Sequence, residues 1–270
     1  MAFLVMTVAF GAKRPRTALA AAAVSFLLLL GERDAVWFVD RAWAMMAAGW
    51  FAFLSLRFPG WTLTARAAAA VVAAATTVAA AVLASPASWT AFEGVVADRA
   101  AATLEAITFE LRRSGGMDPT LAARLDMVFQ AQVLVFPALA GLATSAALAA
   151  AWWGYGKLSG GGAELQPLAT FNFNDHWVWI FVVGLGLLVV GGINPPSRLA
   201  LNLLVFAGGF FALRGLAVVS YLGRRRRRIV YGVLAVLGAL AWPGILSAAL
   251  ILGIADVWLD ARSHQPEEAT

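Results

Sequence analysis

Five consecutive arginines separate two apolar runs, 199–222 and 229–254. They are Arg224, Arg225, Arg226, Arg227 and Arg228. Each apolar run is long enough to cross a bilayer core about 30 Å thick, which needs roughly 20 helical residues. Moving one arginine through the centre of that core costs about 2.5 to 3.5 kcal/mol, so five together strongly oppose translocation. We therefore expect the 224–228 loop to lie on the cytoplasmic side of a membrane and to set the direction of the other segments.

The composition is that of an integral membrane protein. Of 270 residues, 61% are hydrophobic and 13% are charged, whereas an average soluble domain is about 25% charged. The net charge of +5 does not indicate a nucleic-acid partner, because five of the 20 basic residues form the single run beside the apolar segments. The absence of cysteine excludes disulfides, thiolate metal sites and a cysteine nucleophile.

Hydropathy predicts an all-α transmembrane bundle that forms one integral membrane domain over residues 1–270. About eight apolar segments are expected, of which the first is too short to span a bilayer by itself. The segments are 1–11, 17–30, 35–58, 65–84, 119–153, 176–193, 199–222 and 229–254. The fourth is rich in alanine, which would provide either a small surface for close helix packing or simply lipid-neutral positions.

The interval 87–126 is the one sizeable polar part of the chain. Five apolar residues in it recur at spacings of three and four, while charged residues occupy the other faces, as in an amphipathic helix at a membrane surface. The apolar positions are Val96, Ala100, Leu104, Ile107 and Leu111. Asp118 and Pro119 then predict a helix start, and Pro137 predicts a kink in the long helix that follows.

The distribution of basic residues supports a cytoplasmic arginine loop. With that loop inside, eleven basic residues lie on the inner side and three in the short outer loops, which follows the positive-inside rule. The interval 87–126 and both termini would then lie outside. The fully inverted topology is the alternative. The inner residues are Lys13, Arg14, Arg16, Arg57, Arg66, Lys157 and the five of the run.

Arg214 is the strongest candidate for a ligand-binding residue. It lies in the middle of the seventh apolar segment, and an ionisable group at that depth must face water, a partner or a ligand. The alternative is a structural arginine that reaches the inner interface or binds free carbonyls. Asn202, three helical turns away, is a weaker candidate. The five arginines of the 224–228 loop could also bind lipid headgroups, although their role in topology is the simpler interpretation.

Few other residues indicate chemistry. Asp175 and His176, with Asn172 and Asn174 before them, start the sixth segment and are better explained as helix caps than as metal ligands, because His264 is the only other histidine. We find no phosphate-binding loop, hydrolase elbow or zinc motif, so we expect no catalytic activity, cofactor or metal. Gly208, Ala212 and Gly215 share one face and predict a close helix contact within the chain, with dimerisation as the alternative.

The second half of the chain resembles the YybS-like family, whose members are predicted multi-pass bacterial membrane proteins without an established activity. The resemblance rests on the order of several short motifs. They are Phe136-Pro137-Ala138, the stretch 173–179, Asn202, Arg214-Gly215-Leu216-Ala217-Val218, Leu252-Gly253-Ile254-Ala255-Asp256, Asp260 and Arg262. The family is distantly similar to the substrate-binding components of energy-coupling-factor vitamin transporters, which implies a bacterial plasma membrane location and separate coupling subunits.

Two main functions remain open at this point, and an enzyme of lipid or envelope chemistry is a third for which no set of acid, base and nucleophile can be assembled. The first is a transport-related component that binds a small metabolite. Because Arg214 is cationic, an anionic metabolite is the ligand class that this function suggests. The second is a membrane scaffold or assembly partner that docks other membrane proteins through its amphipathic and basic surfaces. The lipid bilayer is a partner in both cases.

Overall fold

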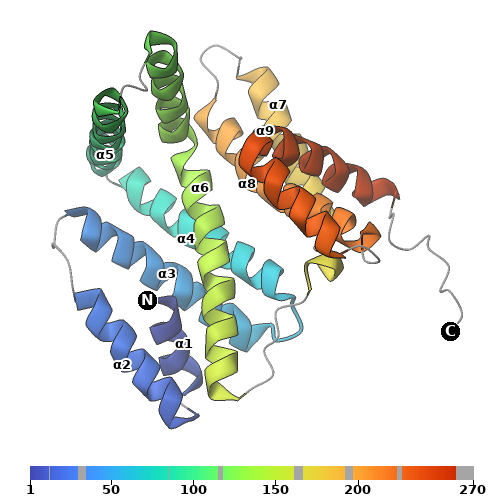
Figure 1. The fold of residues 1–270 in the computed structure, drawn as a ribbon. Coiled ribbons are helices and arrows are strands. Elements are labelled where there is room, and N and C mark those ends of the chain that lie inside the picture. Colours follow the sequence, from blue (N-terminus) through green and yellow to red (C-terminus); the bar gives the residue numbers. More distant parts are fainter. Residues whose placement is uncertain are drawn as a thin grey trace, which may run out of the picture. The chain divides into compact units, whose positions relative to one another are not determined.

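A computed structural model describes residues 1–11, 13–29, 35–84, 86–114, 118–160, 167–191, 197–223 and 227–259 (Figure 1). These residues form nine α-helices and two short 3-10 helices, and none of them lies in a β-strand. The predicted all-α fold is therefore confirmed. Contacts divide the chain into two compact units, Met1–Ala163 and Glu164–Thr270, which we describe one at a time. The expectation of a single integral membrane domain stays a prediction.

The first unit contains six helices whose bounds agree closely with the expected segments. They are α1 (Ala2–Phe10), α2 (Pro15–Leu29), α3 (Ala35–Arg57), α4 (Leu63–Ala84), α5 (Pro86–Arg113) and α6 (Pro119–Ser159). The predicted start of α6 is confirmed, since the Asp118 side chain accepts a hydrogen bond from the Leu121 backbone N–H at 2.7 Å. This helix continues past the expected end near Trp153 and ends at Gly160, whose φ of 72° is a left-handed conformation that favours glycine.

The second unit contains three α-helices and both 3-10 helices. They are η1 (Leu168–Thr170), η2 (Asp175–Trp177), α7 (Val178–Val190), α8 (Arg198–Leu222) and α9 (Arg227–Leu259).

The arginine run is only partly described by the structure. Arg224, Arg225 and Arg226 lie outside the described residues, so the expected loop is not seen at these three positions. Arg227 and Arg228 were also expected in the loop, but they are the first two residues of α9, which therefore begins before the apolar run 229–254. The cytoplasmic position of the run and its binding to lipid headgroups stay predictions.

Three helices of the described part of the chain are long and apolar enough to cross a membrane. They are residues Leu63–Leu83 of α4, Pro119–Ser159 of α6 and Arg198–Leu222 of α8. Two shorter apolar helical stretches, Asp175–Val190 and Gly244–Leu259, accompany them. The structure thus supports membrane-spanning helices, while the expected number of about eight spans is not confirmed.

The alanine-rich helix α4 has two different halves. In its first half Ala67, Ala68, Ala70 and Ala74 are buried, and α4 packs against α3 and α6. In its second half most side chains are exposed, including Thr76 and Thr77, whose hydroxyls donate to backbone carbonyls one turn earlier. Small residues therefore permit close packing in the first half, as expected, and the second half is free to contact lipid.

The amphipathic helix α5 packs against α4 and α6. Four of the five predicted apolar positions are partly buried, and only Ile107 is exposed, while the charged positions Asp98, Arg99, Glu105 and Glu110 are exposed. The apolar face of α5 and the first turns of α6 line a shallow groove that includes Leu104, Phe129 and Val133. The predicted amphipathic pattern is confirmed, and a position at the outer membrane surface stays a prediction.

Helix α8 occupies the centre of the second unit, between α7 and α9. Its side chains Ala207, Phe210, Phe211, Ala217 and Val218 are buried. Ser197 caps the start of α8 by accepting from the Ala200 backbone N–H at 3.4 Å. The buried centre of the unit is therefore made largely by this one helix, which is also the helix that carries Arg214.

Candidate functional site

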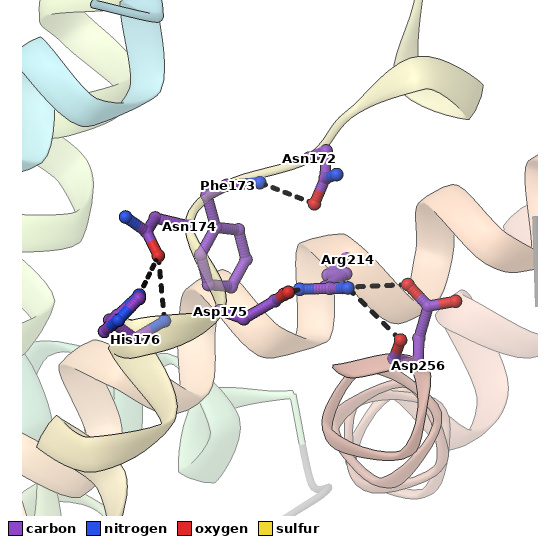
Figure 2. A network of polar contacts seen from close by, with 7 residues as sticks. All are labelled: Asn172, Phe173, Asn174, Asp175, His176, Arg214 and Asp256. Carbon is purple, nitrogen blue, oxygen red and sulfur yellow. Dashed lines mark hydrogen bonds and ion pairs between the residues drawn. The ribbon is translucent and has the colours of Figure 1, made fainter. Parts of the chain in front are cut away.

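Arg214 is buried inside the second unit, with only 3% of its surface exposed. Its guanidinium contacts two carboxylates that lie far from it in the sequence (Figure 2). Nε donates to Oδ2 of Asp256 at 2.8 Å, and Nη2 donates to the backbone carbonyl of Asp256 at 3.2 Å. Nη1 donates to Oδ1 of Asp175 at 2.5 Å. One buried cation therefore joins α8, α9 and the turn η2.

The ion pair between Arg214 and Asp256 depends on a close crossing of α8 and α9. A Cβ atom built on Gly215 would lie 1.8 Å from the backbone oxygen of Ala249, and one built on Gly253 would lie 1.8 Å from the backbone oxygen of Phe211. Only glycine fits at either position without moving a helix. Gly215 adjoins Arg214 and Gly253 lies one turn before Asp256, so the crossing positions both charged side chains.

The small-residue face predicted from the sequence is part of this crossing. Gly208, Ala212 and Gly215 are all buried, and Gly215 makes the closest backbone approach of the three. Contact within the chain is the expected role of this face, and the packing of α8 on α9 confirms it.

Asp175 reaches Arg214 from a segment fixed by local hydrogen bonds and by one aromatic side chain. Asn172 accepts from the Phe173 backbone N–H at 2.9 Å, and Asn174 accepts from the His176 backbone N–H at 3.0 Å (Figure 2). The ring of Phe173 is buried, with Phe211 at a centroid distance of 5.3 Å and the Arg214 Cζ atom at 5.6 Å. The segment thus holds its carboxylate beside the cation.

The two carboxylates are not equivalent. The side chain of Asp256 is 1% exposed, whereas that of Asp175 is 58% exposed. With both ionised, the cluster has two negative charges and one positive charge. Asp256 is the fixed partner of Arg214, because a buried charge left without its partner costs about 3–5 kcal/mol. Asp175 is the more accessible partner, because more than half of its side-chain surface is exposed.

Arg214 is the group of this cluster that could bind an anion, at the donor that Asp175 occupies. Arginine keeps its proton at any pH at which the protein is folded, and its planar fork matches the oxygens of a carboxylate or a phosphate. Within the described part of the chain there is no group of three or more His, Asp or Glu residues that could hold a metal ion.

The structure separates the two residues that the sequence pattern selected as ligand-binding candidates. Arg214 lies at the cluster. Asn202 lies twelve residues earlier on α8, about 18 Å along a helix, and its side-chain amide donates to the Arg198 carbonyl at 2.8 Å. The structure does not bring Asn202 and Arg214 together, and a role of either in ligand binding stays a prediction.

Two residues of the cluster differ from their interpretation in the sequence. The sequence pattern assigned Asp175 to a helix cap, but Asn174 caps η2 and Asp175 pairs with Arg214. The expected apolar segment 229–254 ended before Asp256, but α9 continues to Leu259 and buries Asp256. One feature of the sequence could have indicated that Asp256 is buried. Gly253 and Asp256 are one helical turn apart, so they lie on the same face of a helix.

These features define a class: an all-helical protein with helices able to cross a membrane and with one buried, ion-paired arginine at a helix crossing. The chain belongs to the DUF2232 family of predicted membrane proteins, whose sequence profile matches residues 4–257. No curated protein matches the chain. No solved structure matches it either.

Proposed function

We propose that this protein is a transport-related component of a bacterial plasma membrane that binds a small anionic molecule and has no catalytic activity of its own. In this proposal the apolar segments form about eight passes or partial passes, and the 224–228 loop faces the cytoplasm. The proposal agrees with the family's description as membrane proteins. The resemblance to YybS-like proteins, and through them to energy-coupling-factor components, suggests that separate coupling subunits act with it.

The unequal partners of Arg214 carry this proposal. Asp256 is buried and neutralises the guanidinium permanently. Asp175, which is partly exposed, occupies the Nη1 donor on the more accessible side of the guanidinium. An anionic ligand could take the place of Asp175 at Nη1. The exchange would replace one charge-assisted hydrogen bond by another of similar strength, so binding would be readily reversible, as a transport component requires.

The absence of catalysis is also part of the proposal. A guanidinium cannot act as a general base, and both carboxylates of the cluster accept hydrogen bonds from it. The group therefore favours binding over proton transfer.

Native mass spectrometry of the protein purified gently from its own membrane tests this proposal. We expect a small anionic molecule bound in stoichiometric amount, or coupling subunits that co-purify. Only lipid on the protein would contradict the transport role. In the same experiment an Asn202→Ala variant tests the weaker ligand-binding candidate. If this variant loses the bound molecule, the binding site includes Asn202 as well as Arg214.

A membrane scaffold is the alternative function, and the exposed surface of the first unit favours it. Phe109 of α5 and Met127 of α6 are each about two-thirds exposed or more, which is unusual for large apolar side chains unless lipid or a partner protein covers them. A stoichiometric membrane protein in the mass spectrum, without any small molecule, would favour this alternative.

A further inference from the structure

Arg66 of the first unit lies on aromatic rings at the start of α4. Its Cζ atom is 5.1 Å from the ring centroid of Trp152 on α6 and 5.9 Å from that of Phe51 on α3. The two rings contact each other at 5.8 Å. The face of a tryptophan attracts a cation at such distances, worth about 0.5–2 kcal/mol depending on burial. These rings therefore hold the guanidinium in one place.

The side-chain N–H groups of Arg66 have no partner among the residues that the structure describes. Its Nε atom is buried and has no hydrogen bond, and no ion pair joins Arg66 to any residue for which the structure gives a position. A guanidinium carries five N–H donors in a planar fork. Arg214 in the second unit uses three of them on carboxylate and carbonyl oxygens. Arg66, which is partly buried, offers its donors to an acceptor from outside the chain.

The stretches that contact the end of α6 carry several cations and, by sequence, no acid. Tyr155 of α6 donates to the backbone carbonyl of Gly11 at 2.9 Å, which joins the end of α6 to the end of α1. The Arg14 guanidinium packs against Gly160 at the end of α6. Lys13, Arg16, Arg57 and Lys157 belong to the same three stretches, 1–16, 51–66 and 152–160, and these contain neither aspartate nor glutamate.

This end of the first unit also matches the level of lipid headgroups. α4 begins here and α6 ends here, and both are long and apolar enough to cross a membrane. Tryptophan and tyrosine are enriched at that level. The amino end of α4 adds a partial positive charge beside Arg66.

We infer that Arg66 binds the phosphate group of an anionic phospholipid, with Trp152 as the platform that orients its guanidinium. Two phosphate oxygens would accept from the fork, which is the geometry that arginine prefers for phosphate. The cations of the stretches 1–16, 51–66 and 152–160 favour a headgroup with net negative charge over a zwitterionic one, because they repel the choline ammonium. This site is independent of the Arg214 cluster and of the function proposed for it.

Titration of the detergent-purified full chain, followed by native mass spectrometry, tests this site. The probes are dioleoylphosphatidylglycerol, dioleoylphosphatidylcholine and inorganic phosphate. For the wild-type protein we expect one phosphatidylglycerol to bind before all others and more tightly than phosphatidylcholine. Equal affinity for the two lipids would overturn the inference. Tight binding of inorganic phosphate in competition with the lipid would assign the site to a soluble phosphate compound, which would also overturn it.

Variants then locate the site. Arg66→Gln should weaken the first phosphatidylglycerol about tenfold or more, because a charge-assisted hydrogen bond is lost. The control is Arg124→Gln, since Arg124 is an exposed cation near the start of α6, far along the helix from Trp152. We expect a change of less than about twofold. Equal effects of the two variants would contradict a specific site at Arg66.

A conservative variant keeps the test valid if Arg66→Gln does not fold. Arg66→Lys retains the charge and most of the side-chain packing, but it lacks the planar fork. We expect the lysine variant to fold, as measured by its circular dichroism spectrum, and to bind phosphatidylglycerol several-fold more weakly. Unchanged affinity in this variant would show that charge alone suffices and would refute the proposed geometry.

Discussion

Replacing Gly215 by alanine should separate α8 from α9 and weaken the buried ion pair. A Cβ atom at this position lies 1.8 Å from the Ala249 carbonyl oxygen, whereas real Cβ contacts essentially never fall below 3.0 Å. The obstacle is backbone, so a rotamer change cannot relieve it, and the helices must move apart by more than an ångström. The 2.8 Å bond between Arg214 and Asp256 would then be stretched beyond hydrogen-bond length.

The magnitude follows from two costs. Overpacking of a close contact costs about 1–3 kcal/mol, and weakening a buried charge pair adds part of the 3–5 kcal/mol that its complete loss would cost. Alanine gains back at most about 1 kcal/mol through its better helix propensity. We therefore expect Gly215→Ala to lower the free energy of unfolding by at least about 2 kcal/mol.

The assay is unfolding in mixed micelles at increasing fractions of sodium dodecyl sulfate, monitored by circular dichroism. Gly208→Ala is the matched control, because it lies on the same face of α8 and the nearest atom to its Cβ is 3.7 Å away, an ordinary contact. We expect the control to be as stable as wild type or slightly more stable. If both variants unfold like the wild-type protein, the glycine crossing does not set the distance between the helices and our reasoning fails.

Four further variants test the energetics by the same unfolding assay. Asp256→Ala should cost about 3–5 kcal/mol of unfolding free energy, because it leaves Arg214 buried without its fixed partner. Asp175→Asn should cost about 1 kcal/mol, because more than half of that side chain is exposed. Equal losses would contradict the assignment of fixed and exchangeable partners. The double variant Arg214→Leu with Asp256→Leu should be more stable than Arg214→Leu alone or Asp256→Leu alone, since no charge of the pair remains buried. If the losses of the two single variants simply add in the double variant, the two residues are not a coupled pair. Asp118→Ala should cost about 1 kcal/mol through loss of the α6 cap, and an unchanged midpoint would show that solvent replaces this cap.

The sequence predicted most of the helix bounds, because apolar length and local caps are local properties. Asp118 and Pro119 mark the start of α6, and the structure contains the hydrogen bond that this pattern implies. The end of α6 was predicted six residues too early. Near this end Tyr155 is buried, because its hydroxyl donates to the Phe10 and Gly11 carbonyls at the end of α1, and that contact is not visible in the local pattern.

Only one residue of the Arg214 cluster could be selected from the sequence. Arg214 was conspicuous because a single charge interrupts an apolar run. Its partners lie 39 and 42 residues away, and hydropathy does not report pairing over such distances. Asp256 lies just beyond the expected apolar segment 229–254, whereas α9 continues to Leu259 and buries it. Arg66 was counted only for topology, since its aromatic platform comes from two other helices.

The most direct test of the proposed anion site compares three forms of the protein by calorimetric titration with a panel of small carboxylates and with inorganic phosphate. The forms are the wild type, Asp175→Asn, and the double variant Arg214→Gln with Asp256→Asn, which removes both charges of the buried pair. Our account predicts that the asparagine at position 175 strengthens binding of an anion, because the competing carboxylate is gone, and that the double variant abolishes it. Binding that is weakened by Asp175→Asn, or retained by the double variant, would contradict the account.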